Sequence, residues 1–429
     1  MPRHEGWKEW SLRDIGEWRS GGTPSKGRPD YWNGSVPWVS PKDMKVFALR
    51  DTLDHISERA LSDGARHVPA GSIFIVVRGM ILAHTFPVCL AEQPMAFNQD
   101  VKAIVTNSSV DGRFLAHWLH GRSDALLRLV TEATHGTKRI DLRDLLAHSI
   151  TLPPLPEQRR IAEILDTVDE AIRKTEEIIT KLKQVKQGLL HDLLTRGIDD
   201  NGELRDPDRH PEQFKDSPLG RIPKAWEPVE LGDLVSASRP IVYGILMPGQ
   251  GHPGGVPVVK VKDIKNGVVA AHGLLLTSPA IDYQYRRSRL AEGDLLFTIR
   301  GTVGRTAFVP SRLHDANITQ DTARIGLVRG NPDFVREYLS MPRPRGFIET
   351  HTIGVAVKGI NLRDVRRIPL ALPAQAEADG IASRLLGIRR RVAMERAQAS
   401  KLRLLKHGLM EDLLSGSIRV TALLEEPAE

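Results

Sequence analysis

The chain contains a long internal repeat. The phrase LLHDLLTRGI (Leu189–Ile198) returns as LMEDLLSGSI (Leu409–Ile418), an offset of 220 residues. The same offset relates VPWVSPKDMK (36–45) to VPVVKVKDIK (256–265). In a chain of 429 residues, two copies of this length exclude an array of short repeats. The sequence therefore predicts two related halves, each with a globular domain and an appended element.

The first part of each copy has the pattern of a mixed globular domain. Short apolar runs such as SIFIVV (72–77) and DLLFTI (294–299) are bounded by Gly, Pro and Asn, and they predict strands. Helical segments such as FLAHWLHGRSDALLRLV (114–130) lie between such runs. This mixture predicts an α+β domain of roughly 150 residues.

A heptad seam follows each domain. Apolar residues recur at alternating spacings of four and three, which is typical of a coiled coil. The seam consists of Ile161, Leu165, Val168, Ile172, Leu182, Leu189 and Leu193 in the first copy, and of Ile381, Leu385, Ile388, Val392, Leu402, Leu409 and Leu413 in the second. The two seams break at matching positions, Thr175 with Glu395 and Lys186 with Lys406. Each helix is roughly 50 Å long at about 1.5 Å per residue. We expect the two helices to pair antiparallel about a pseudo-two-fold axis.

These patterns divide the chain into six segments. They predict a first globular domain at 1–152, a long helix at 153–197, a Gly-, Pro- and charge-rich linker at 198–222, a second globular domain at 223–372, a second long helix at 373–418 and a tail at 419–429.

Composition narrows the class of protein. The formal charge of +7 and a pI near 9.5 make a polyanion a plausible partner. The single cysteine, Cys89 in TFPVCLA, cannot form an internal disulfide, and we expect it to be a small buried apolar residue. The N-terminus lacks an apolar leader, and no run approaches the roughly 18 apolar residues of a membrane span. We expect a soluble, cytoplasmic protein.

The sequence shows neither a P-loop nor an H-E-x-x-H motif. NPDF (331–334) is similar to the N-P-P-F signature of adenine methyltransferases, but a helix N-cap followed by proline explains it better. In RGTVGR (300–305) two arginines flank glycines that let a backbone approach a phosphate. The first copy keeps only Arg78 and Gly79 of this pattern.

A loose nuclease pattern is present in the first copy. Asp30 is followed by Asp43 and Lys45, as in sites where carboxylates hold Mg²⁺ near a lysine. The second copy keeps Asp263 and Lys265 without the upstream Pro-Asp. A stand-alone Mg-dependent DNA endonuclease that uses Asp30, Asp43 and Lys45 is therefore an alternative, and a capped turn is the structural explanation of the same residues. A coiled-coil scaffold with no role on DNA is a third hypothesis.

Several motifs carry a resemblance to a known family. SGGTP (20–24), NQD (98–100), HGTKRIDLRDL (135–145), LPPLPEQRRIAEILD (152–166) and KQGLLHDLLTRGI (186–198) occur in this order. Together they resemble the specificity subunit of type I restriction-modification systems, over essentially the whole chain. The second copy, LPAQAEADGIA, has lost most of PEQRRIA but keeps Pro373, Glu377, Ile381 and Ala382. That loss puts strict symmetry of the partner contacts in doubt.

The resemblance implies a non-catalytic DNA reader. Each globular half would be a target recognition domain for one half of a bipartite, asymmetric site, and the paired helices would set the gap. Two methyltransferase subunits would carry the S-adenosylmethionine chemistry, and restriction subunits with translocase activity would use ATP and Mg. No cofactor is expected in this chain, and its partners would be double-stranded DNA and those subunits, without a membrane.

Candidate DNA contacts follow from residue type and loop position, since Lys and Arg bind phosphates and polar side chains contact base edges. We predict Thr23, Ser25, Lys26, Lys42, Arg78, Lys138 and Arg139 in the first half, and Lys260, Lys262, Arg300, Arg305 and Lys358 in the second. The loops of the two halves differ, for example SGGTPSKGRPDYWNG against SASRPIVYGILMPG, as two different half-sites would require.

Overall fold

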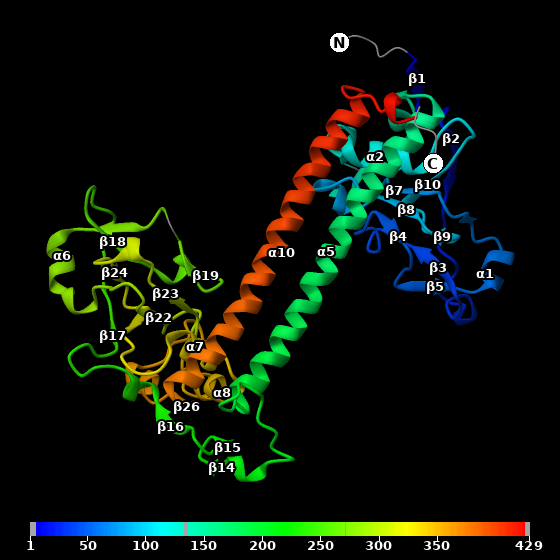
Figure 1. The fold of residues 1–429 in the computed structure, drawn as a ribbon. Helices are drawn as coiled ribbons and strands as arrows, with labels where there is room; N and C mark the ends of the chain where they lie inside the picture. Colours follow the sequence, from blue (N-terminus) through cyan, green and yellow to red (C-terminus); the bar gives the residue numbers. More distant parts are fainter. Residues whose placement is uncertain (1–5, 133–135, 271, 425–429) are drawn as a thin grey trace. The chain divides into compact units, whose positions relative to one another are not determined.

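A computed structural model of the chain describes residues 6–132, 136–270 and 272–424 (Figure 1). It divides into two compact units, the first made of 1–178 with 395–429 and the second of 179–394. Two helices of 41 residues each, α5 (Leu155–Thr195) and α10 (Gln375–Ser415), contribute to both units. The units therefore do not coincide with the two sequence copies. Each contains one globular domain, part of its own helix and part of the other copy's helix.

The first unit is built on a five-stranded and a four-stranded sheet, with strand orders β2-β10-β7-β8-β4 and β5-β3-β9-β6. The strands are β2 (Gly16–Ser20), β3 (Val36–Val39), β4 (Ala48–Leu49), β5 (Asp54–Ile56), β6 (His67–Val68), β7 (Ile73–Val76), β8 (Val88–Ala91), β9 (Met95–Phe97) and β10 (Val101–Thr106). Two strand pairs add β1 (Lys8–Ser11) with β13 (Ser149–Leu152), and β11 (Val130–Glu132) with β12 (Lys138–Ile140). The short helices are α1 (Glu58–Ser62), α2 (Gly112–Gly121), α3 (Ser123–Leu127) and α4 (Leu142–Leu146).

The second unit repeats this plan with shorter strands. A four-stranded sheet has the order β17-β25-β22-β23, and a three-stranded sheet has the order β21-β18-β24. The strands are β17 (Val242–Tyr243), β18 (Val256–Val259), β21 (Leu275–Thr277), β22 (Leu295–Thr298), β23 (Thr306–Phe308), β24 (Asn317–Ile318) and β25 (Thr322–Ile325). Strand pairs are β16 (Glu227–Glu230) with β26 (Pro369–Leu372), and β19 (Ile264–Lys265) with β20 (Val268–Val269). The helices are α6 (Pro279–Gln284), α7 (Pro332–Tyr338), α8 (Pro342–Thr350) and α9 (Leu362–Arg366).

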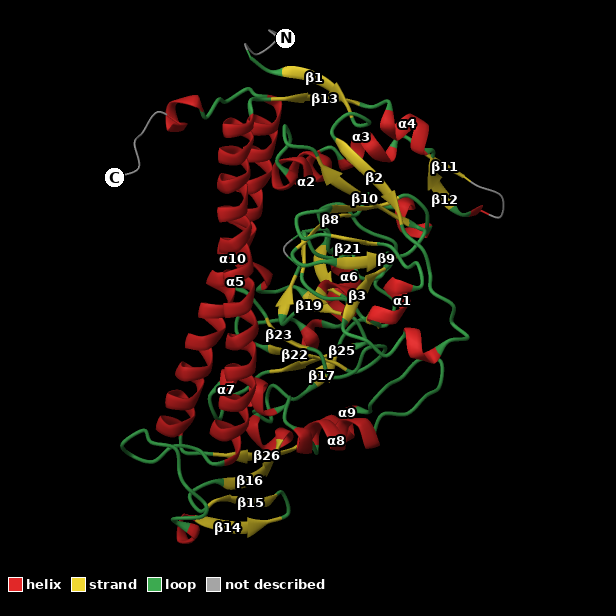
Figure 2. Cartoon of the chain, turned by 90° about the vertical axis from the view of Figure 1, so that its right-hand side faces the viewer, coloured by secondary structure: helices red, strands yellow, loops and turns green. Residues whose placement is uncertain are grey.

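The predicted linker contains ordered structure. Within 198–222, an antiparallel hairpin begins with β14 (Phe214–Ser217) and returns through β15 (Gly220–Pro223), which are both visible in Figure 2. Its Ile222 is 5% exposed and belongs to the core of the second unit. Gly, Pro and charged residues here form a tight hairpin and caps, so composition alone was a poor guide to this segment.

In each domain, a short helix that packs against the long helix (α2 in the first domain and α7 in the second) begins with the same kind of N-cap. Asp111 accepts hydrogen bonds from the backbone N–H groups of Arg113 and Phe114 at the start of α2 (both 3.0 Å). Asn331, which stands 220 residues later, accepts one from Phe334 at the start of α7 (3.0 Å). The N-cap explanation of NPDF is therefore confirmed, since capping side chains satisfy otherwise unpaired N–H groups.

Each hydrophobic core joins the beginning of one long helix to the end of the other. The first core contains Ile161 and Leu165 of α5 with Leu413 of α10. The second core contains Leu193 of α5 with Ile381 and Leu385 of α10. Within each unit the two helices therefore run antiparallel, as predicted.

The seam positions of both helices are buried or half-buried along their whole length. Two of the four polar breaks in the seams have local explanations. The Thr175 hydroxyl donates to the carbonyl of Ala171 one turn earlier (2.8 Å), and Lys406 donates to Asp169 on the facing helix (2.7 Å). In the described part of the chain, no helix is both long and apolar enough to cross a membrane.

Candidate nucleic-acid interface

Three segments of the first domain meet where β7 ends. The backbone N–H groups of Val77 and Arg78 donate to the carbonyl of Asp100 (2.9 and 3.3 Å), and that of Gly79 donates to the carbonyl of Lys138 (2.9 Å). Arg78 also forms a backbone bridge with Arg139. This junction brings three predicted DNA contacts together, namely Arg78, Lys138 and Arg139.

The second domain has the same junction where β22 ends. The backbone N–H groups of Ile299 and Arg300 donate to the carbonyl of Asp321 (2.8 and 3.2 Å), and that of Gly301 donates to the carbonyl of Lys358 (2.8 Å). Gly301 has φ +78°, a conformation that side-chain-bearing residues rarely adopt. Two of the predicted contacts, Arg300 and Lys358, therefore lie together on a backbone frame that the chain builds twice.

The first junction presents mainly hydrogen-bonding and cationic side chains. The Thr23 hydroxyl donates to Oε1 of Gln99 (2.7 Å), which places the predicted Thr23 beside the turn that carries Asp100. The Lys138 ammonium donates to Glu132 (2.6 Å) and lowers the pKa of that carboxyl. We did not predict Gln99 as a contact, although a glutamine occupies the matching place in both copies, as NQD and TQD.

The second junction borders a cavity of about 630 Å³. Arg300, Gln320 and Asn361 supply its polar lining, and Tyr243 and Leu246 are apolar neighbours that are 52% and 53% exposed. Arg pairs with guanine edges and Gln or Asn with adenine edges, and an exposed aromatic ring offers a surface for stacking or packing. This cavity is the better-defined of the two candidate base-contacting sites. Sequence reasoning found only Arg300 of this set.

The other predicted contacts lie elsewhere on the domains. Lys42 pairs with Asp54 (2.6 Å), and Lys26 is exposed on its loop. Ser25, also exposed, accepts a hydrogen bond at its carbonyl from the Trp32 indole (3.2 Å). Lys260 and Lys262 belong to one short turn that precedes β19. None of these side chains belongs to either junction, and of the four predicted residues Lys26, Ser25, Lys260 and Lys262 only Lys260 is half-buried.

Arg300 and Arg305 both lie in the loop that joins β22 to β23, but their side chains line different cavities. The Nη1 of Arg305 donates to the carbonyl of Ile264 (3.4 Å), and its side chain lines a second, smaller cavity with Arg336 and Glu349. The two arginines of RGTVGR therefore do not converge on one phosphate.

The carboxylates of the nuclease pattern are used by local structure. Asp43 accepts hydrogen bonds from the backbone N–H groups of Ser40 (2.9 Å) and Leu53 (3.0 Å). Arg28 donates twice to Asp30 (2.8 and 2.9 Å) and lowers the pKa of that carboxyl. Asp263 closes the same turn as Asp43 by accepting from the N–H of Lys260 (2.9 Å). The capped-turn explanation is thus the one that the structure supports.

Cys89 is buried, as predicted. Its thiol donates to the carbonyl of Val46 (2.8 Å), and burial raises its pKa to about 12. A thiol in this state is a poor nucleophile.

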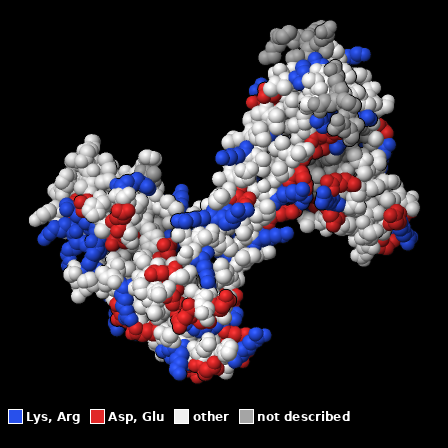
Figure 3. Space-filling model, in the orientation of Figure 1, with Lys and Arg blue, Asp and Glu red and all other residues white. Residues whose placement is uncertain are grey.

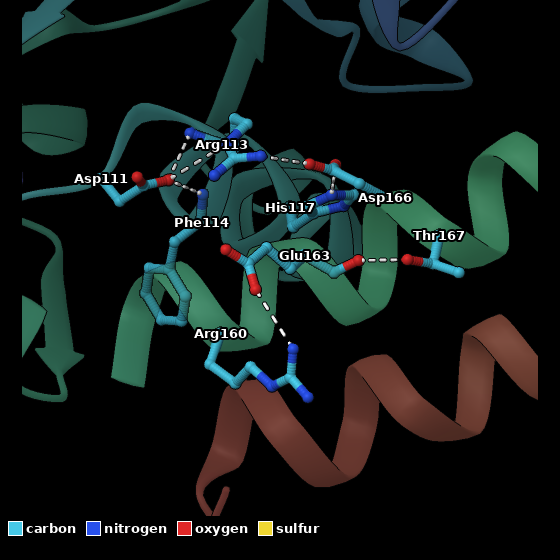
Figure 4. A network of polar contacts seen from close by, with 8 residues as sticks. All are labelled: Asp111, Arg113, Phe114, His117, Arg160, Glu163, Asp166 and Thr167. Atoms are coloured by element: carbon cyan, nitrogen blue, oxygen red, sulfur yellow. Dashed lines mark hydrogen bonds and ion pairs between the residues drawn. The ribbon is translucent and has the colours of Figure 1, made fainter. Parts of the chain in front are cut away.

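A polar network attaches the first domain to its own helix (Figure 4). On α2, Arg113 Nη1 donates to Asp166 of α5 (3.1 Å), and His117 Nε2 lies 2.8 Å from the other oxygen of the same carboxylate. His117 is fully buried and its ring stacks on Phe47 at 4.3 Å. The network fixes the domain on the helix through a specific charged contact.

The second domain is attached to α10 from the matching positions of its own short helix with the charges reversed, but the partner on the long helix lies three residues further along, because Leu386 stands where Asp166 stands in the first copy. Asp333 and Glu337, which stand 220 residues after Arg113 and His117, lie on α7. Arg389 of α10 donates to Glu337 (2.8 Å) and lies 3.7 Å from Asp333.

A glutamate near the start of each long helix, buried in α5 and 11% exposed in α10, binds an arginine beyond the end of the other helix. Glu157 of α5, whose side chain is 1% exposed, pairs with Arg419 (2.7 Å). Glu377 of α10 pairs with Arg205, and it also accepts from the N–H of Ile198 (2.9 Å) and the indole of Trp226 (3.0 Å). We call these two contacts the Glu157 clasp and the Glu377 clasp. The Glu377 clasp gives a structural role to a glutamate that the second copy keeps while Pro156, Gln158, Arg159 and Arg160 of the motif are replaced.

Comparison with known proteins agrees with this architecture. Residues 4–184 match the family described as Type I restriction modification DNA specificity domain. The specificity subunit of the type I restriction enzyme EcoR124I/EcoR124II of Escherichia coli is 37% identical over 186 residues, 43% of this chain and 46% of that protein. The EcoBI specificity subunit, also of Escherichia coli, is 31% identical over 306 residues, 68% of this chain and 62% of that protein. The matches thus span about half to two thirds of these relatives.

Longer matches are more distant. The MjaIX specificity subunit of Methanocaldococcus jannaschii is 22% identical, with 97% of this chain and 95% of that protein covered. The crystal structure of the S subunit of a type I restriction-modification system from M. genitalium has a TM-score of 0.57 at 12% identity, with 96% of this chain and 97% of that one covered. This likeness shows the same α+β fold with two long helices. The chain belongs to the family of type I restriction-modification specificity subunits.

Proposed function

We propose that this chain reads a bipartite, asymmetric DNA sequence and brings catalytic partner subunits to it without being an enzyme itself. The observation that carries the proposal is the duplicated junction. One backbone frame presents Thr23 with Gln99 in the first domain, and Tyr243 with Gln320 in the second. Two junctions with the same backbone hydrogen bonds but different side chains are suited to contact two different DNA half-sites.

The side chains divide by role. Gln99, Gln320 and Arg300 have the hydrogen-bonding groups that distinguish base edges in the major groove. Lys and Arg outside the cavities, such as Lys26 and Lys262, suit phosphates, because phosphate contacts supply salt-dependent affinity and register without sequence information.

The long helices would set the distance between the half-sites. Their seams are continuous in α5 and α10, and each domain is attached to its own helix by a charged network. A change in the number of heptads in both helices would therefore change the gap that the complex accepts.

The partners follow from the family. We propose that two methyltransferase subunits bind S-adenosylmethionine and modify adenine, and that restriction subunits with ATP and Mg join them. The chain would act in the cytoplasm, on cellular and invading DNA. Cofactors would be bound by those partners.

The experiment is a half-site test in cells that carry the complete modification system. Gln99→Ala should relax the methylated sequence in one half-site only, and Gln320→Ala in the other only, as sequencing of methylated adenines would show. Lys224→Ala, an exposed change outside both junctions, is the matched control. If each variant altered both half-sites, or neither, the two-reader proposal would be wrong.

A further inference from the structure

A cavity of about 390 Å³ in the second unit is lined by five arginines. They are Arg239, Arg286, Arg287, Arg289 and Arg324, and we call this cavity the arginine pocket. Figure 3 shows Lys and Arg side chains gathered beside α6 on this face. Val242 lines the arginine pocket, and the next residue, Tyr243, lines the cavity of Arg300 and Gln320. The two cavities therefore flank the same edge strand, β17.

Two of the arginines are already neutralised. Arg239 pairs with Asp294 and Arg289 pairs with Asp282, and both carboxylates are almost completely buried. Positive charge in the pocket must therefore come from the other three arginines.

Two of those three lie at the rim. The guanidinium of Arg286 lies 4.7 Å from the ring centroid of Tyr283 and donates to the Tyr283 carbonyl (3.2 Å). Arg287 is exposed, and within the described residues its side chain has no hydrogen-bond or ion-pair partner. The acid in the lining, Asp315, has a side chain that is 71% exposed and lies 3.7 Å from His314. Solvent weakens the effect of its charge, which is the last and smallest contribution to the raised pKa of Arg289 in the pocket.

Arg324 lies at the base of the pocket with unused donors. It is 1% exposed, and its Nη2 donates to the carbonyls of Pro240 (3.0 Å) and Arg287 (3.2 Å). Its Nε and Nη1 are buried without a hydrogen-bond partner among the described residues. Burial, and then repulsion from Arg239, lowers the pKa of Arg324. A buried cation with unpaired N–H groups is costly, and a bound anion would offset that cost.

Arg324 itself has no arginine counterpart in the first domain. Arg324 faces Leu296 in the β22–β25 ladder, and Ala103 faces Phe74 at the same register of the β7–β10 ladder. A small apolar residue therefore fills the place that Arg324 takes in the second domain. The arginine is an addition to the second domain and is not required by the shared scaffold.

We propose that the arginine pocket binds one phosphate group of the DNA backbone, beside the bases that Arg300 and Gln320 contact. The proposal rests on the function proposed above. Arginine donors match the geometry of a phosphate, and a phosphate held on one side of β17 would fix the register of bases on the other side. Free phosphate has the same chemistry, but the shared edge strand favours the DNA backbone as its source.

The test uses the full chain assembled with its modification subunits, the Arg287→Gln variant, and Arg363→Gln as a matched control. Arg363 is an exposed arginine of the same domain that lies outside the pocket. DNA affinity is measured between about 50 and 200 mM salt. Arg287→Gln should weaken binding roughly fivefold at the lower salt and reduce the slope of log K against log salt by about one, with the recognised sequence unchanged. Arg363→Gln should leave the slope as in the wild type.

Methylphosphonate scanning then identifies the phosphate. One neutralised position should weaken the wild type and have no effect on Arg287→Gln. If Arg287→Gln keeps the wild-type slope and the wild-type response to every methylphosphonate, the proposal is overturned. The same holds if inorganic phosphate raises the Tm of the wild type but not of Arg287→Gln while DNA binding is equal, because the pocket would then take free phosphate. If the wild-type complex shows no sequence-dependent DNA binding at all, the function proposed above fails first.

Discussion

The two domains are attached to their long helices from matching positions on α2 and α7, and the charges of the two contacts are opposite in sign. In the first unit Arg113 of α2 pairs with Asp166 of α5, whereas in the second unit Glu337 of α7 pairs with Arg389 of α10. The place of the contact on the short helix is the same in both copies, whereas on the long helix it has moved by three residues and its charge has changed sign. Each domain is therefore matched to the helix that follows it. A domain transplanted onto the other helix without compensation would bring like charges together.

The two clasps differ in how many donors the buried carboxylate has. Among the described residues, Arg419 donates to both carboxylate oxygens of Glu157, whereas Glu377 accepts from Arg205, the N–H of Ile198 and the indole of Trp226. Arg419→Met should thus remove the cation from a carboxylate that is 1% exposed and lower the free energy of unfolding by about 3 kcal/mol. Arg205→Met should cost only about 1 to 2 kcal/mol, because the other two donors remain. Urea unfolding of the full chain measures both, and equal losses would contradict the comparison.

The charge reversal predicts an effect of intermediate size. Arg389→Glu places a third acid beside Asp333 and Glu337 and should lower the free energy of unfolding by about 2 kcal/mol. Adding Glu337→Arg gives the second unit the polarity of the first and should recover about 1 kcal/mol or more. A double-mutant cycle by urea unfolding measures this coupling. A coupling energy near zero would mean that the attachment depends on packing alone.

The repeat and the helical seams could be predicted from the sequence because both depend on patterns of residues that are close together in the chain. The spacing of Ile161 and Leu165 specifies a helix face without reference to distant residues, and the repeat supplies the same pattern again at Ile381 and Leu385. The N-cap at Asn331 was recognisable for the same reason.

Contacts between residues far apart in the chain could not be predicted in this way. Glu157 and Arg419 are 262 residues apart, and no periodicity relates them. Arg324 stands in the buried strand β25, where a pattern of apolar residues predicts only packing. The sequence identified Arg300 by its glycine-rich loop but gave no local sign that Gln320 and Tyr243 line the same cavity.

The smallest expected difference between the two halves depends on pH. His148 stands before β13, and Ile368, fully buried, takes its place before β26. Burial, and then the charge of Arg122, lowers the pKa of His148 below its ordinary value of about 6.5. As pH falls through about 6.5, the unfolded chain therefore binds more protons at His148 than the folded chain does. The contribution of His148 to the free energy of unfolding is highest above that pH, where the imidazole is neutral in both states, and it decreases below that pH. Because the imidazole is only half-buried, the loss between pH 7.5 and 5.5 should be about 0.5 kcal/mol.

His148→Ile, which gives the first half the residue of the second, should reduce the pH dependence of the free energy of unfolding by that amount, as urea unfolding at several pH values would measure. His84→Gln, a change at a histidine with an exposed side chain, controls for the loss of an imidazole as such. If His148→Ile had the same pH dependence of the urea midpoint as the wild type, the histidine would not make the stability of the first half depend on pH.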